Sequence, residues 1–113
     1  MNIEAQIQKI NELVKKGNKA SFKLALDKAI NLQKKIKPNS FVQNLTGFIL
    51  QRSGHMMEAI KYYENAHKLD KKNISPLNNL AYIYEKLKEW ELAKKYFDKV
   101  KELDPNNLIY LIN

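Results

Sequence analysis

Hydrophobic residues recur along most of this chain at intervals of three and four positions, the spacing that places side chains on one face of an α-helix. Over the last two-thirds of the sequence this pattern predicts four helices, at roughly 40–53, 56–69, 76–87 and 90–103. The connections between them are short, so consecutive helices are expected to pack antiparallel. The pattern therefore predicts an all-α chain built from helical hairpins.

Residues that begin or end helices stand at the edges of these stretches. Ser40 is expected to open the first helix, and Ser75-Pro76 reads as the N-cap and first residue of the third. Gly54 follows the first helix, where a left-handed residue ends a helix at little energetic cost. Asp104-Pro105 follows the last one, and proline cannot continue a helix.

A period of 34 residues underlies the four helices. Sliding the chain by 34 positions lays residues 40–73 over residues 74–107. The matched positions are mostly apolar and lie at helical spacing, which indicates a repeated packing plan. The matches include Asn44 with Asn78, Phe48 with Tyr82, Ile49 with Ile83, Ala59 with Ala93, Tyr62 with Tyr96, Tyr63 with Phe97, and Leu69-Asp70 with Leu103-Asp104.

Residues 1–39 form a more degenerate unit of the same kind. One helix is expected to end at Gly17-Asn18, and a second, longer helix to run to about Ile36, before Pro38. The distance from Gly17 to Ala25 exceeds the distance from Gly54 to Ala59, so the register of this first unit is placed only loosely.

The motif Leu80-Ala81-x-x-Tyr84, followed by Ala93-x-x-x-Phe97 and Asp104-Pro105-Asn106-Asn107, resembles the tetratricopeptide repeat signature. Lys88 stands where the family usually has a turn glycine. The resemblance implies a right-handed helical-hairpin solenoid of about three repeats in a single domain, residues 1–113. The units are then 1–39, 40–73 and 74–107, and residues 108–113 start a truncated or capping helix.

Composition narrows the possible environments of the chain. It has 113 residues, 44% of them hydrophobic, and no cysteine, which excludes disulfides and thiolate metal sites. The N-terminus lacks the basic start and unbroken apolar run of a signal peptide. No stretch approaches the roughly 18 consecutive apolar residues that a spanning helix needs. We expect a cytoplasmic protein of a bacterium with no membrane partner.

The net charge of +8 is concentrated at one end. Residues 1–38 contain nine lysines and three acidic residues, a net charge of +6. Such a basic region could attract nucleic acid. However, Arg52 is the only arginine in the chain, and nucleic-acid readers favour arginine for bidentate contacts. Lys-mediated nucleic-acid binding is therefore only the third hypothesis.

No constellation of side chains predicts catalysis. His55 and His67 lie twelve positions apart without an HExxH pattern, so a zinc site is not indicated. The serines lie near helix ends, where capping explains them. We expect no enzyme activity, no metal, no cofactor and no small-molecule substrate.

The resemblance also implies a concave groove lined by the first helix of each hairpin. An asparagine there can hydrogen-bond the backbone of a bound peptide, and an aromatic ring can anchor an apolar side chain. The partner is then another protein, held through a peptide or an extended segment. The predicted groove residues are Phe41, Asn44, Phe48, Gln51, Arg52, Asn78, Tyr82, Glu85 and Lys86.

Several alternatives stay open. Phe48 and Tyr82 could simply pack against neighbouring helices. The stretch 39–47 is similar to first helices found ahead of bacterial sulfotransferase or glycosyltransferase domains, so the chain could be the N-terminal scaffold of a larger enzyme. The apolar end of the chain could also mediate self-association, through Leu108, Ile109, Leu111 and Ile112.

Overall fold

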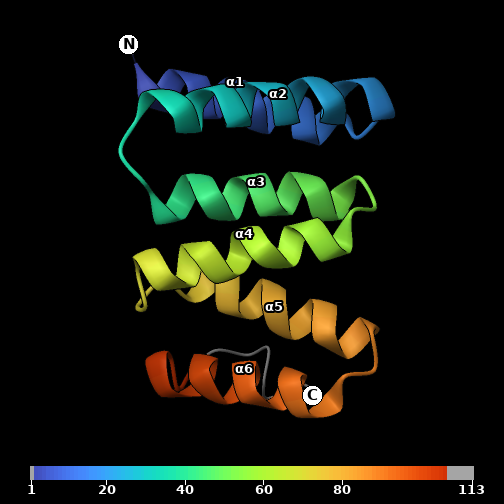
Figure 1. Cartoon of the computed structure of the whole chain (residues 1–113), viewed down its shortest axis with the longest axis vertical. Coiled ribbons are helices and arrows are strands. Elements are labelled where there is room, and N and C mark those ends of the chain that lie inside the picture. The colour runs from blue at the N-terminus through green and yellow to red at the C-terminus, as the bar shows by residue number, and fades with distance from the viewer. Residues whose placement is uncertain (1, 107–113) are drawn as a thin grey trace.

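A computed structural model describes residues 2–106, which form six α-helices and no strand. The helices pair into three antiparallel hairpins that are stacked along the longest axis of the molecule (Figure 1). The expectation of an all-α helical repeat solenoid is confirmed. The helices are α1 (Ile3–Lys16), α2 (Lys19–Lys35), α3 (Ser40–Arg52), α4 (Met56–Leu69), α5 (Ile74–Lys86) and α6 (Trp90–Leu103).

Neighbouring hairpins are joined through the second helix of one and the first helix of the next. Thus α2 packs on α3, and α4 packs on α5. The first helices α3 and α5 also contact each other across the hairpin boundary. This contact brings two first helices close together, so they line the inner side of the stack.

Asparagine begins four of the helices. The side chains of Asn2, Asn18, Asn39 and Asn73 each accept a hydrogen bond from a backbone N–H in the first turn of the helix that follows. Such a cap satisfies one of the N–H groups that a helix start leaves unpaired. Ser40 is the first residue of α3, as expected, and Asn39 caps it. One expectation is corrected: Asn73 rather than Ser75 caps α5, because asparagine two positions earlier supplies the acceptor.

The turns between paired helices require left-handed backbone. Gly17 has φ 69° and Gly54 has φ 88°, as expected for residues that end helices. Lys88 stands 34 positions after Gly54 and takes φ 61°, the same conformation, although it carries a Cβ. The third hairpin therefore keeps the backbone of the turn without the residue that favours it.

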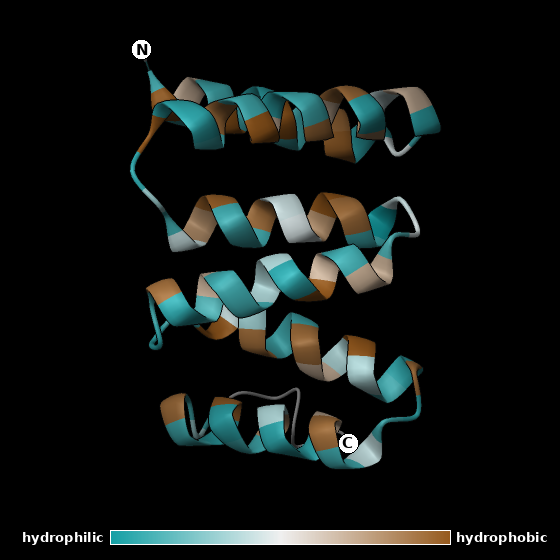
Figure 2. Cartoon of the chain, in the orientation of Figure 1, coloured by the Kyte–Doolittle hydropathy of each residue, from teal (hydrophilic) through white to brown (hydrophobic). Residues whose placement is uncertain are grey.

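Two buried clusters form the core. One lies between α1, α2 and α3 and includes Ile10, Leu32 and Ile49. The other lies between α3, α4, α5 and α6 and includes Tyr63 and Leu80. Leu26 packs against both clusters. Every helix alternates apolar and polar stretches along its length, as an element with one buried face does (Figure 2).

Some expectations are not tested by this structure. Residues 108–113, with the predicted self-association residues Leu108, Ile109, Leu111 and Ile112, lie outside the described residues. The assignment of residues 1–113 to one domain stays a prediction. Within residues 2–106, no helix has both the length and the apolar character needed to span a membrane.

Candidate functional site

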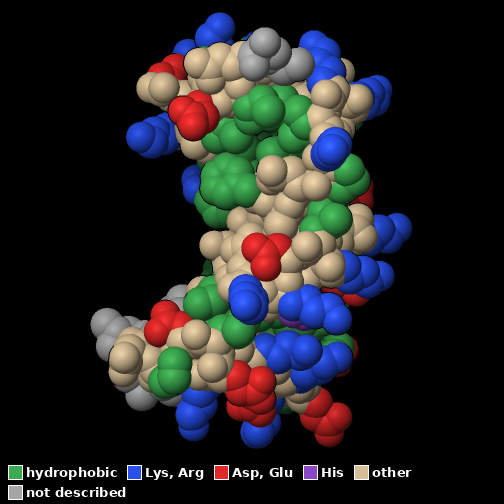
Figure 3. Space-filling model, turned by 90° about the vertical axis from the view of Figure 1, so that its left-hand side faces the viewer, with side chains coloured by type: hydrophobic (Ala, Val, Ile, Leu, Met, Phe, Trp, Pro, Cys, Tyr) green, Lys and Arg blue, Asp and Glu red, His purple; other side chains and the backbone are tan. Residues whose placement is uncertain are grey.

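The inner side of the stack is hollowed. In the space-filling view of Figure 3, the left-hand outline of the molecule curves inward between its upper and lower ends. Hydrophobic side chains gather in the upper part of the face that Figure 3 turns to the viewer, at the level of the first hairpin and α3. The predicted groove residues lie on α3 and α5, the two first helices that contact each other.

The two helices are joined by an amide pair. Asn79 Nδ2 on α5 donates a hydrogen bond of 3.1 Å to Asn44 Oδ1 on α3. The carbonyl of Asn44 is therefore already engaged, and it is Asn79 rather than the repeat-matched Asn78 that meets it. The Oδ1 atom of Asn78 is buried and has no hydrogen-bond partner among the described residues. This link ties α5 of the third hairpin to α3 of the second.

Phe48 and Arg52 act as a pair on the inner face of α3. Phe48 is half-buried and packs against the first core cluster. The Cζ atom of Arg52 lies 5.7 Å from the centre of the Phe48 ring and 5.8 Å from the ring of Phe22 on α2. A guanidinium group this close to two aromatic rings is held by cation–π attraction. Phe48 thus has a packing role, as the alternative interpretation expected of it.

Tyr82 and Phe41 are the exposed aromatic residues among those predicted for the groove. Tyr82 is 46% exposed and Phe41 is 54% exposed. The Nζ atom of Lys86, one turn after Tyr82 on α5, lies 5.3 Å from the centre of the tyrosine ring. The side chain of Lys86 therefore covers part of the tyrosine ring and places its ammonium group beside it. These exposed rings can contact a partner without any rearrangement of the core.

The other two predicted residues face in different directions. Gln51 Oε1 accepts a hydrogen bond of 2.5 Å from the hydroxyl of the buried Tyr63 on α4. The side chain of Gln51 therefore points toward α4 of its own hairpin. Glu85 lines a shallow hollow against α6 together with Trp90. Within the predicted set, the exposed residues are Phe41, Arg52, Tyr82 and Lys86.

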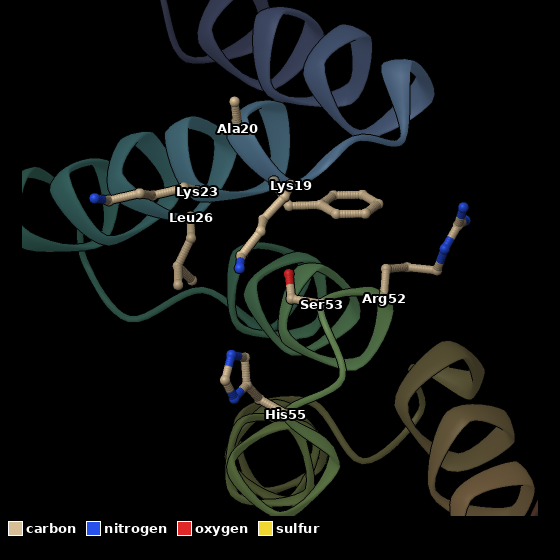
Figure 4. A pocket seen from close by; sticks show the side chains of 8 residues that line it. Lys19, Ala20, Lys23, Leu26, Arg52, Ser53 and His55 are labelled. Atoms are coloured by element: carbon tan, nitrogen blue, oxygen red, sulfur yellow. The ribbon is translucent and has the colours of Figure 1, made fainter.

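Sequence reasoning missed a second concave feature, which we name the hairpin pocket. It has a volume of about 790 Å³ and lies between the start of α2 and the turn that joins α3 to α4 (Figure 4). The signal for it was present in the long Gly17-to-Ala25 spacing, which gives α2 17 residues where α4 and α6 have 14. The extra N-terminal turn of α2 forms one wall. The lining residues are Lys19, Ala20, Phe22, Lys23, Leu26, Arg52, Ser53 and His55.

One titratable group outside the groove, His67, has a pKa that is changed by burial. His67 on α4 is half-buried, and its Nδ1 atom is buried without a hydrogen-bond partner in the described part of the chain. Burial lowers the pKa of His67, and the positive charges of Lys99, Lys71 and Lys95 lower it further. Within residues 2–106, no group of three or more acidic or histidine side chains is placed to hold a metal ion. The imidazole of His67 is therefore harder to protonate than a free imidazole.

Known proteins match parts of this chain. Residues 75–107 match the family model described as Tetratricopeptide repeat. The chain is 39% identical over 64 residues to the uncharacterized protein ycf37 of Pyropia yezoensis, a match that covers 57% of this chain and 36% of that protein. It is 28% identical over 126 aligned residues to the tetratricopeptide repeat domain-containing protein PYG7, chloroplastic, of Arabidopsis thaliana, covering 95% of this chain and 42% of the relative. The chain therefore spans less than half the length of these curated relatives.

Proposed function

We propose that this chain holds a peptide or an extended protein segment in its concave groove, because its residues 75–107 match the tetratricopeptide repeat family, whose repeats generally serve as non-catalytic protein-interaction modules. The observation that carries the proposal is the exposure of Phe41 and Tyr82 on the first helices α3 and α5. Large aromatic side chains left half-exposed on a hollowed face favour partner binding.

The groove offers both an apolar and a polar contact. The ring of Tyr82 presents apolar surface, and the ammonium group of Lys86 beside it can pair with a carboxylate or a backbone carbonyl of the partner. The hydrogen bond between Asn79 and Asn44 fixes the spacing between α3 and α5. A groove that is already ordered loses little conformational entropy on binding, which favours affinity.

A photo-crosslinking experiment tests the groove. A photoreactive phenylalanine analogue is placed at Tyr82 in one variant and at Met57 in another, and each is irradiated in lysate of the source cell. Met57 is the matched control because it is 69% exposed but lies on the second helix α4. Mass spectrometry then identifies the crosslinked segment.

The proposal expects one protein segment to be crosslinked from Tyr82 and not from Met57, and expects Tyr82→Ser with Phe41→Ser to remove that protein from a pull-down. Circular dichroism of the double variant should show unchanged helicity, since both rings are exposed. Equal crosslinking from both positions, or crosslinking to nucleic acid, would contradict a groove-binding module. We further propose that the protein acts in the cytoplasm, which fractionation of the source cell tests.

A further inference from the structure

We propose that the hairpin pocket binds an acidic segment of a partner protein. One aromatic or aliphatic side chain of that segment enters the pocket beside Phe22 and Leu26. Carboxylates that flank this side chain pair with Lys19, Lys23 and Arg52. The inference rests on the proposed function, because it names the chemistry of the partner protein. It places the contact outside the groove that contains Phe41 and Tyr82.

The floor of the pocket is apolar. Phe22 and Leu26 are only half-buried, although both pack against the core clusters. Figure 4 shows Leu26 pointing into the space between α2 and the α3–α4 turn, with His55 below it. Burial of such surface by a ligand side chain removes apolar area from water, which is favourable at about 25 cal/mol per Å². The floor of the pocket therefore favours a ligand with an apolar side chain.

The walls of the pocket are basic and carry no acidic side chain. Lys19, Lys23 and Arg52 line it, and no aspartate or glutamate does. Within residues 2–106, neither lysine is paired with a carboxylate. In Figure 4, Lys19 reaches from α2 toward Ser53 on the opposite side. Three cations around one apolar opening are complementary to an anionic ligand and would repel a basic one.

The starts of two helices add to this potential. Lys19 is the first residue of α2, and His55 immediately precedes α4, so both helices begin at the pocket. A helix N-terminus carries a partial positive charge that attracts anions. The charge of the surrounding sequence acts in the same direction, because residues 1–38 have a net charge of +6.

Arg52 is the residue best placed to bind a carboxylate of the ligand. The rings of Phe22 and Phe48 lie 5.8 Å and 5.7 Å from its Cζ atom, so the guanidinium group is held at the edge of the pocket before any ligand arrives. A guanidinium group can donate two parallel hydrogen bonds to one carboxylate. Because the contact with Phe48 reaches the inner face of α3, Arg52 connects the pocket to the groove.

An acidic protein segment fits this surface better than a nucleic acid does. A base would need a free aromatic face for stacking. The pocket has one phenyl ring, Phe22, and Arg52 already lies against it; the other ring is the imidazole of His55 at the α3–α4 turn. The rest of the floor is aliphatic, from Ala20 and Leu26, and suits a protein side chain.

The test uses the isotope-labelled chain and a synthetic nine-residue peptide with a central Leu-Phe pair flanked by aspartates and glutamates. A second peptide carries asparagine and glutamine in place of the acids. In NMR titrations, the acidic peptide should shift the amide signals of residues 19–26 and 52–55, and the neutral peptide should bind much more weakly. Lys19→Glu with Lys23→Glu should reduce the affinity at least about tenfold.

The matched control is Lys9→Glu with Lys28→Glu, which changes the net charge equally. These lysines line a different hollow, between α1 and α2. The proposal expects the control to bind almost as tightly as the unaltered chain at physiological salt, and both variants to keep their helicity. An equal loss in both variants would overturn the proposal, because it would indicate non-specific charge attraction.

Other occupants give distinct outcomes. Binding of a single-stranded uridine oligomer at residues 19–26 without binding of the acidic peptide would replace the protein partner with RNA. Light scattering could instead show a dimer. If Lys19→Glu with Lys23→Glu converted that dimer to a monomer, the pocket would be assigned to a second copy of the chain. Peptide shifts confined to Phe41 and Tyr82 would overturn the pocket but support the groove, so the two proposals fail separately.

Discussion

A Cβ atom added to Gly47 would lie 2.8 Å from Cε1 of Tyr63, so α3 and α4 cross at a contact between a glycine and a tyrosine ring. Tyr63 is fully buried, and its hydroxyl donates to Gln51, so the ring has little freedom to move. Position 47 corresponds to Ala81 in the next hairpin, and Tyr63 corresponds to Phe97. The glycine at position 47 allows α3 and α4 to approach each other closely at this point.

Gly47→Ala should therefore destabilise the protein. Alanine favours a helix over glycine by about 1 kcal/mol, but overpacking a tight core typically costs about 1–3 kcal/mol. We expect the overpacking to exceed the gain in helix propensity, with a net loss in the free energy of unfolding measured by urea titration. Combining Gly47→Ala with Tyr63→Leu should recover part of the loss. Increased stability of the single variant would show that the ring can move aside.

Gly54 and Lys88 are matched positions with the same left-handed backbone and different residues. An added Cβ at Gly54 would meet nothing within 4 Å, so substitution there tests the backbone alone. A left-handed conformation costs a residue with a Cβ about 1–2 kcal/mol, partly offset by about 0.4–1 kcal/mol because glycine is more flexible when unfolded. We expect Lys88→Gly to raise the melting temperature and Gly54→Lys to lower it. Shifts of the same sign would contradict this account.

Ala59 and Ala93 are another matched pair, at the start of α4 and of α6. Ala59 is 0% exposed, and Ala93 is 4% exposed but borders the hollow with Trp90 and Phe97. Ala59→Leu should cost about 1–3 kcal/mol through overpacking. Ala93→Leu should cost less, because part of the larger side chain can enter the hollow. Thermal melting of both variants checks the order, and unchanged melting of Ala59→Leu would mean that the helix crossing has room for a larger side chain.

His67 should make the protein less stable in mild acid. Burial and three lysines lower the pKa of His67, so the folded chain resists a proton that the unfolded chain accepts near pH 6.5. Its contribution to stability is complete above about pH 6.5 and decreases as the pH falls from there toward the lower pKa of the folded state. Urea unfolding at pH 7.5 and 5.5 measures this decrease.

His67→Gln should flatten that pH dependence. His55→Gln is the matched control, because it replaces the chain's other histidine at an exposed position of the α3–α4 turn. The same pH dependence in the His67 variant as in the unaltered chain would assign the effect to other groups.

The ends of the helices show how much of the structure is specified by the local sequence. The helix ends were placed to within one or two residues, because glycine, proline and the apolar spacing act locally. Ser40 is the first residue of α3 as predicted, but the predicted cap Ser75 is wrong, because Asn73 accepts the hydrogen bond there, as Asn39 does at α3. These two asparagines are 34 residues apart, so the repeat itself contained the information.

The candidate site was predictable only in part. Its location on the first helices followed from the resemblance, and the exposure of Tyr82 and Phe41 agrees with a binding role. The direction of Gln51 toward Tyr63 and the pairing of Asn44 with Asn79 could not be read from spacing. Each depends on how one helix is rotated against another, which no single helix specifies.

By itself, the sequence determined the six helices, their pairing and the 34-residue period, because apolar spacing and turn residues act over distances of a few positions. Only the tertiary structure decided which of the periodic residues stay free. Packing of α2 on α3 placed Phe22 beside Arg52 and left the hairpin pocket open above the α3–α4 turn. The exposure of a side chain depends on which elements pack around it. Phe48 and Tyr82 occupy the same repeat position, yet Phe48 is half-buried and Tyr82 is exposed.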